Sequence, residues 1–457
     1  MIAATTMEGK DTYLANFTRF EQESPRHSWV APLRRAAMAR FTELGFPTTR
    51  NEEWRQTSVA PITKIPFSPA RKGTNGFTAA DLSRYTFGSE DCAQLVFVNG
   101  YFSDDLSSLS ALPRGVRVKS LAAAMDADRI LLEPHLARHA GYEKDSFTAL
   151  NTAFMTDGAF IYIPPAVVLD RVLHLIFIST AQKEPAVVHP RNLVVVGNGS
   201  QVSIVESYFS LGPGVYFNNA VTEIVAGNSS AVDFYKIERE NDDAFHMDTL
   251  HVVQQRDSSF SSHSISLGGS IVRNNLNVVL DGEGADCTLN GLYVIKGRQH
   301  VDNHTVIDHA KPHCNSRELY KGILDERSTA VFNGGILVRK DAQKTNAKQT
   351  NKNLLLSREA LVNTKPELKI FADDVKCTHG ATIGQLDEDA MFYLRSRGID
   401  QASARVLLTY AFANDLLASM KVKPLQCQID LVLLTRLSRG HENLIDAGEA
   451  SRVEGIL

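Results

Sequence analysis

The spacing of hydrophobic residues divides the chain into three regions. In residues 1–145 the spacing is mainly helical, and in 27–47 and 135–154 apolar side chains recur every three to four positions. In residues 146–383 apolar and polar residues alternate in short, β-branched segments, which indicates strands. Helical spacing returns in residues 384–457. We therefore predict a β core between two mainly helical regions, with domain boundaries at these positions.

Turn-like sequences interrupt the middle region at regular intervals. Four breaks rich in small polar residues begin at Gly197, Gly227, Arg256 and Gly282, roughly 25 to 30 residues apart, which is the spacing of coils in a solenoid. Long helical patterns are absent between the strands, which argues against a βαβ sheet. Many short strands fit either a β-sandwich or a β-helix. The turn spacing favours a parallel β-helix, whose ends need caps.

The last region carries clear helix boundaries. Asp387 can cap the start of one helix, and Gly398 ends it. Asp400 begins a second helix, which we expect to end at Pro424. A third helix is expected over residues 427–440. These signals predict a compact helical segment after the β core.

Composition narrows the class of protein. The chain of 457 residues has 43% hydrophobic and 22% charged residues, which is typical of globular proteins. Its net charge of -4 argues weakly against a nucleic-acid partner. No apolar run is long enough for a membrane span, and the N-terminus does not resemble a signal peptide. The odd number of widely separated cysteines predicts free thiols and a reducing, cytoplasmic location; they are Cys92, Cys287, Cys314, Cys377 and Cys427.

The most specific local feature is the sequence from Lys376 to Gly380, which contains Cys377 and His379. In a strand, residues two apart point the same way, so this thiol and imidazole would share one face. A thiol beside an imidazole or ammonium loses its proton more easily, which suits sulfur transfer or iron ligation. The alternative is a buried cysteine that only packs, beside a hydrogen-bonded histidine.

Two further clusters are less specific. His300, His304, His309, His313 and Cys314 lie close together in sequence but lack the spacing of a known metal site. Solvated or backbone-bonded histidines are the alternative. A second cluster has a lysine at every fourth position, which predicts one solvated strand face rather than a phosphate contact; its members are Lys340, Lys344, Lys348 and Lys352.

Enzyme chemistry finds little support in the sequence. The chain has no GxxxxGK[ST] phosphate loop and no GxSxG nucleophile motif. A carbohydrate-active enzyme, a common use of parallel β-helices, would need two carboxylates across a groove. The acidic residues of the middle region could qualify only if folding brought them together; they are Asp281, Glu283, Asp302 and Asp308.

Longer segments resemble a known family. Residues 314–338, 349–357 and 365–399 are closely similar to the SufB/SufD family of iron–sulfur cluster assembly scaffolds, and residues 50–62 and 147–164 extend the resemblance over nearly the whole chain. The family implies a right-handed parallel β-helix flanked by helical segments. It also implies a non-catalytic scaffold that works in a complex with SufB and with the ATPase SufC.

The resemblance also suggests roles for individual residues. The position that matches His379, with Cys377 beside it, lies at the SufB–SufD interface of the family and is implicated in cluster formation and transient iron binding. SufC docks on the C-terminal helices, where we expect it to contact Phe392, Tyr393, Arg395 and Arg397. No cofactor is expected to stay bound to this chain alone. The iron–sulfur cluster would be transient in the SufB–SufD complex, and ATP would enter only through SufC.

Two departures favour the SufD branch of the family. SufB-like chains carry a cysteine before the leucine-rich strand, whereas Thr350 to Asn353 contain none. SufB-like chains also tend to have Glu-His-Glu-Ala where this chain has Thr378, His379, Gly380 and Ala381. A third interpretation is a structural homodimer without metal, because solenoids expose strand edges that pair readily.

Overall fold

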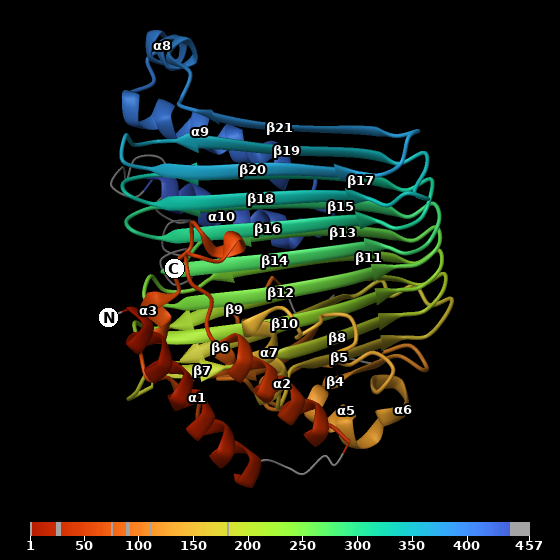
Figure 1. Cartoon of the computed structure of the whole chain (residues 1–457). Helices are drawn as coiled ribbons and strands as arrows, with labels where there is room; N and C mark the ends of the chain where they lie inside the picture. The colour runs from red at the N-terminus through yellow and green to blue at the C-terminus, as the bar shows by residue number, and fades with distance from the viewer. Residues whose placement is uncertain are drawn as a thin grey trace.

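The core of the protein is a parallel β-helix built from two facing sheets (Figure 1). The computed structural model describes residues 2–23, 29–74, 76–87, 92–109, 112–180 and 182–438. Within these residues one sheet has 11 strands, which are β20 (Leu361–Ile370), β18 (Thr329–Val338), β16 (His300–His309), β14 (Ile271–Leu280), β12 (Phe245–Gln254), β10 (Tyr216–Ala226), β8 (Arg191–Val196), β5 (Ala159–Ile163), β4 (Arg117–Ser120), β7 (Ala186–Val188) and β1 (Ser68–Pro69).

The facing sheet has 10 strands within the same residues. In spatial order they are β21 (Lys376–Gly384), β19 (Asn346–Leu355), β17 (Asn315–Leu324), β15 (Asp286–Ile295), β13 (Ser259–Ser266), β11 (Ala231–Arg239), β9 (Gln201–Leu211), β6 (Val172–Thr180), β2 (Cys92–Val98) and β3 (Tyr101–Phe102). From β8 to β21, strands two places apart in sequence pair in parallel. This topology confirms the predicted parallel β-helix and excludes the β-sandwich.

The turn spacing read from the sequence matches the coils of the solenoid. Phe245, Ile271 and His300 are successive partners in one ladder, 26 and 29 residues apart. Inward-pointing side chains fill the lumen, and glycines make room for its largest rings. A Cβ at Gly291 would lie 2.1 Å from the Tyr320 ring, and one at Gly322 would lie 2.2 Å from the Tyr293 ring.

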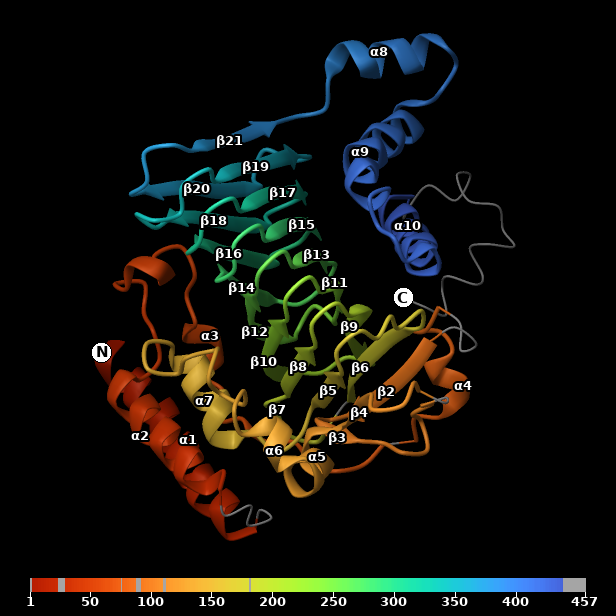
Figure 2. The same cartoon turned by 90° about the vertical axis from the view of Figure 1, so that its right-hand side faces the viewer.

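The helices flank the solenoid on different sides (Figure 2). Helices α1, α2 and α7 share an aromatic core with the outer side of β10 and β12. The helices are α1 (Ile2–Glu23), α2 (Ala31–Leu44), η1 (Glu52–Trp54, a 3-10 turn), α3 (Ala60–Thr63), α4 (Ala79–Leu82), α5 (Leu121–Ala127), α6 (Arg129–Leu132), α7 (Ser146–Phe154), α8 (Glu388–Ser396), α9 (Gln401–Leu417) and α10 (Lys423–Ser438).

Two expectations for the first region need correction. Residues 92–98 form strand β2, which pairs with β6 although the sequence around it reads as mainly helical. All seven side chains are buried, so the strand shows no alternation of polar and apolar residues. The predicted helix over 135–154 exists only from Ser146, because the backbone of Ala137 and His139 donates instead to the Glu223 carboxylate.

The last region forms the three expected helices. Asp387 and Asp400 cap α8 and α9 through hydrogen bonds from backbone N–H groups. Pro424 was expected to end the second helix, but α9 ends at Leu417 and Pro424 lies in the first turn of α10, where proline is tolerated. The expected third helix reaches Ser438, and its last two residues lie outside the described chain. No helix in the described ranges is long and apolar enough to cross a membrane.

The two ends of the solenoid differ in how they are covered. At the N-terminal end, β2, β4 and their neighbours add buried side chains such as Leu95 and Val118 to the lumen core. At the other end, which we call the open end, β20 and β21 are the last strands of the two sheets and most of their residues are exposed or half-buried. Helix α8 projects beyond this end in Figure 2.

Candidate functional site

Cys377 and His379 lie on β21, the last strand of the open end. Cys377 pairs with Ala347 in the ladder and packs beside the small cluster that contains Ile336, so it points inward. His379 lies two residues further along the same strand and therefore shares this face, as predicted. It is exposed, because no coil lies above it in the described chain.

The chemistry expected of Cys377 needs correction. The sequence suggested that neighbouring His379 or Lys376 lowers the pKa of the thiol. Instead, burial raises the pKa of Cys377. The thiol is therefore less reactive in this chain than an exposed cysteine, and a partner or metal would have to activate it.

The lumen directly below His379 holds two polar residues that the sequence analysis missed. Gln349 pairs with His379 in the ladder, and Glu318 pairs with Gln349. Gln349 Nε2 donates to Glu318 Oε2 at 2.7 Å. Both positions follow the inward alternation of their strands, so the two-residue period places them in the lumen. Their contact depends on register across 31 residues, which the sequence does not specify locally.

The histidine cluster does not converge on one point. His300 and His304 lie on the outer side of β16, whereas His309 on the inner side bonds to Ser316 Oγ at 2.9 Å. His313 adopts a positive φ in a turn, and Cys314 is buried. Among the described residues, no group of three or more His, Cys, Asp or Glu side chains could hold a metal ion. The predicted alternative of solvated or backbone-bonded histidines fits only the exposed His313, because the rings of His300, His304 and His309 contact other side chains.

His304 instead belongs to an ionic network that fixes the N-terminal segment. Its Nε2 lies 2.9 Å from Asp302 Oδ1, and its Nδ1 lies 3.3 Å from Glu53 Oε2. Arg273 Nη1 donates to Asp302 Oδ2 at 2.7 Å and to the Glu53 carbonyl, while its guanidinium lies 3.8 Å from the centre of the Trp54 ring. The network attaches residues 52–57 to the outer side of β14 and β16.

The acidic residues of the carbohydrate-enzyme alternative are not assembled into a catalytic pair. Both carboxylate oxygens of Asp302 form ion pairs, with Arg273 and His304. Asp308 accepts two hydrogen bonds from Arg339. Asp281 and Glu283 lie in an exposed turn. Neither Asp281 and Glu283 nor Asp302 and Asp308 face each other across a groove as a catalytic pair would. The structure therefore does not support a carbohydrate-active enzyme.

The prediction that the four lysines share one strand face is wrong. Lys348 and Lys352 point outward from β19 and are exposed, but Lys340 and Lys344 lie in the turn before it. Lys344 forms an ion pair with Asp374. The four side chains are solvated, and they do not form one stripe.

Helix α8 exposes the residues predicted to bind the ATPase subunit. Phe392 is 73% exposed and Tyr393 is 56% exposed, which is unusual for aromatic side chains. The Arg397 guanidinium lies 5.2 Å from the centre of the Tyr393 ring, and Arg395 lies in the last turn. No residue of α8 is buried. The helix therefore presents an aromatic and basic surface that the described chain does not cover.

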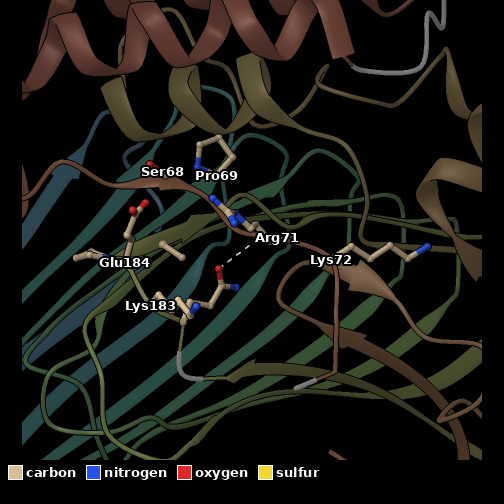
Figure 3. Close-up of a pocket in the computed structure, with 9 residues that line it drawn as sticks. Ser68, Pro69, Arg71, Lys72, Lys183 and Glu184 are labelled. Carbon is tan, nitrogen blue, oxygen red and sulfur yellow. Dashed lines mark hydrogen bonds between the residues drawn. The ribbon is translucent and has the colours of Figure 1, made fainter. Parts of the chain in front are cut away.

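A hollow of about 270 Å³ lies beside the paired strands β1 and β7, away from these residues (Figure 3). Arg71, Lys72 and Lys183 contribute positive charge to its lining, but the Lys72 side chain extends away from Arg71. The backbone N–H of Arg71 donates to Gln182 at 3.3 Å. The basic side chains do not point toward one position, so the hollow does not form an anion-binding site.

Comparisons with known proteins agree with this geometry. Residues 177–412 match the model "SUF system FeS cluster assembly, SufBD core domain", and residues 7–175 match "SufBD protein N-terminal region". The chain is 38% identical to an iron–sulfur cluster assembly SufBD family protein of Synechocystis, over 86% of this chain and 88% of the relative. It is 29% identical to the iron–sulfur cluster assembly protein SufD of Escherichia coli, over 92% and 96%. The chain therefore belongs to the SufBD family of iron–sulfur cluster assembly proteins, among its SufD-like members.

Proposed function

We propose that this chain is a non-catalytic scaffold subunit that pairs with a SufB-like subunit through its open end. The observation that carries the proposal is the position of His379 and Cys377 on the last, uncovered strand. A partner that covered this strand would enclose both side chains at the interface. Iron and sulfide are the substrates of such a site.

The open end has the properties of a protein interface. It exposes a set of large apolar side chains around β20 and β21, and such patches mark association surfaces; they are Leu361 (54%), Ile370 (39%), Phe371 (64%) and Ile383 (51%). The last strands also present unpaired backbone N–H and C=O groups. A partner strand would satisfy these groups and bury the apolar residues together.

The ligands on this chain do not complete a cluster site. His379 supplies one imidazole and Cys377 one thiol, whereas an iron–sulfur cluster usually takes four protein ligands. The remaining ligands would come from the partner. The cluster would therefore be held jointly with the partner and would not reside on this chain alone.

We further propose that α8 docks a SufC-like ATPase. Aromatic residues and arginine are the side chains most often found at the centre of interfaces, and Phe392, Tyr393, Arg395 and Arg397 supply both kinds. The chain carries no phosphate loop, so ATP would act only through the docked subunit. The five cysteines are free, which suits the cytoplasmic location predicted from their spacing.

Co-purification tests both surfaces separately. The chain is expressed with the SufB-like and SufC-like subunits of its own organism. We expect Ile383→Asp to lose the SufB-like subunit, because a charge would enter the interface, and Phe392→Ala/Tyr393→Ala to lose only the SufC-like subunit. Ile130→Asp and Leu109→Ala are matched controls, since Ile130 is 89% and Leu109 40% exposed outside the open end and the C-terminal helices. Unchanged binding in the open-end and α8 variants would refute the assignment of these surfaces.

A homodimer is the second candidate, because the same apolar open end could cover a second copy. The mass of the isolated chain in solution separates the two. A dimer that the SufB-like subunit dissociates supports the scaffold proposal. A dimer that persists beside that subunit, without iron, supports the homodimer.

A further inference from the structure

A polar ladder runs inside the lumen from a buried acid to the open end. Glu318 on β17, Gln349 on β19 and His379 on β21 occupy one register position in three successive coils. Glu318 is 2% exposed and Gln349 1% exposed. Neighbouring strands lie about 4.8 Å apart, so each side chain in such a ladder can reach the next.

The Gln349 amide is held in one orientation. Its Nε2 donates to Glu318 Oε2 at 2.7 Å, so the amide nitrogen faces the buried acid. The backbone of Gly334 leaves the space for the amide, because a Cβ there would lie 2.3 Å from Nε2 and 2.8 Å from Cδ. An amide flip would place an oxygen against a carboxylate, which repels it.

This orientation leaves one polar atom without a partner. Gln349 Oε1 is buried and accepts no hydrogen bond. Most buried polar atoms in native proteins have a hydrogen-bond partner, so this oxygen is a candidate acceptor for a nearby donor. The amide nitrogen faces β17, and the next residue of the ladder on the other side is His379, whose ring can donate an N–H.

We propose that Glu318 and Gln349 are positioning residues for His379: the Glu318 carboxylate orients the Gln349 amide, whose oxygen accepts a hydrogen bond from one imidazole N–H and leaves the other ring nitrogen to bind Fe²⁺. This inference rests on the proposed role of His379. Histidines that bind metals generally donate their second N–H to such an acceptor, which fixes the tautomer and the ring orientation. The ladder supplies this acceptor through an amide instead of a direct carboxylate.

A double-mutant cycle on Fe²⁺ affinity tests the proposal. The complex with the SufB-like and SufC-like subunits is titrated anaerobically with Fe²⁺ against a chelator, at pH 8. This pH keeps Glu318 ionised, because burial raises its pKa to about 7 although contacts with Thr305 and Gln349 lower it. We expect Gln349→Met and Glu318→Leu, which removes the acceptor of the Gln349 N–H, to weaken Fe²⁺ binding about 10-fold or more. In a His379→Gln background neither change should have a further effect.

The matched control is Gln254→Met, which removes another fully buried lumen glutamine several coils away. An equal loss in this variant, or a loss from Gln349→Met that persists without His379, would show a general disturbance of the coil and overturn the inference. If His379→Gln weakens Fe²⁺ binding and Gln349→Met does not, the inference is wrong and the proposed function stands. If His379→Gln has no effect, both are wrong.

A second measurement needs only the isolated full chain. The ring ¹⁵N shifts of His379, assigned by comparison with His379→Asn and recorded at pH 8, report which ring nitrogen carries the proton. We expect Gln349→Met to change the tautomer ratio about five-fold, the effect of one ordinary hydrogen bond. A ratio that is the same in Gln349→Met and in the wild type contradicts the proposal.

Discussion

The N-terminal part of the solenoid and its open end are built from the same kind of coil but differ in how completely their side chains and backbone groups are buried and paired. Beside the first coils, Glu223 accepts three backbone N–H groups at 2.8 to 2.9 Å and pairs with Arg191 at 2.7 Å, with both side chains fully buried. At the open end, apolar side chains and strand edges face solvent. One region is internally complete, and the other has the features of a surface that needs a partner.

The largest expected effect comes from the completed region. Glu223→Ala would leave the buried charge of Arg191 without a counter-charge, although its Nη1 still donates to Asn151 and Thr152, and would leave three backbone N–H groups without an acceptor. We expect a loss of about 3–5 kcal/mol in the free energy of unfolding, measured by urea denaturation. Glu367→Ala, on β20 at the open end, is the control and should change it by less than about 0.5 kcal/mol. Equal losses would erase the distinction between the two regions.

Cysteine reactivity gives the next contrast. We expect iodoacetamide at pH 8 to modify exposed Cys427 first and half-buried Cys377 about 10-fold more slowly, because burial raises the pKa of Cys377 and restricts access. Mass spectrometry over time measures both rates. Adding the SufB-like subunit should protect Cys377 and leave Cys427 unchanged. If Cys377 reacts first, the half-buried thiol is more accessible than its position indicates.

A smaller effect is expected from the ionic network around His304. Burial lowers the pKa of His304, but the Asp302 and Glu53 carboxylates outweigh it and the net shift is upward from 6.5. The hydrogen bond with His304 lowers the pKa of Glu53 from 4.5. The histidine contribution is therefore complete below pH 6.5 and fades as the pH rises, while the Glu53 contribution is complete above about pH 4.5 and fades as the pH falls.

Stability measured against pH tests this network. The difference between the wild type and His304→Gln should be largest, about 1 kcal/mol, between pH 4.5 and 6.5, and should shrink above pH 7. His309→Gln is a control in which burial lowers the histidine pKa to about 4. A difference for His304→Gln that stays constant from pH 5 to 9 would mean that the imidazole is not charged in the folded chain.

The smallest effect is expected from removing an aromatic ring at the open end. Phe371→Ala should leave the free energy of unfolding of the isolated chain within about 0.5 kcal/mol of the wild type, because the side chain is 64% exposed. Phe147→Ala, in the covered aromatic core beside Trp54 and Phe217, should cost about 3–5 kcal/mol. A large loss from Phe371→Ala would show that the open end has packing of its own.

Local signals predicted the parts of the fold that depend on local physics. The caps of α8 and α9 follow from Asp387 and Asp400, and the coil length follows from the turns at Gly227 and Gly282. Strand β2 was missed because a fully buried strand has no polar alternation. The helix expected before Ser146 was overridden by the distant Glu223 carboxylate.

The candidate site was only partly predictable. The shared face of Cys377 and His379 follows from strand alternation, and its exposure follows from being on the last strand. Glu318 and Gln349 could not be assigned to it, because their contact with each other depends on the register of two coils. The histidine-rich sequence suggested a possible metal site for the opposite reason. Residues that are close in sequence there lie in the lumen, on the outer face and in a turn, and do not meet.

The ladder register has a consequence for biosynthesis. Each strand pairs with one that left the ribosome about one coil earlier, as Ile271 does with Phe245, so the solenoid can grow in the order of translation. The covered N-terminal coils can then serve as a template for later ones. The strand that carries His379 is added last among the described strands, so the edge offered to a partner exists only when the other coils of the solenoid have already been synthesised.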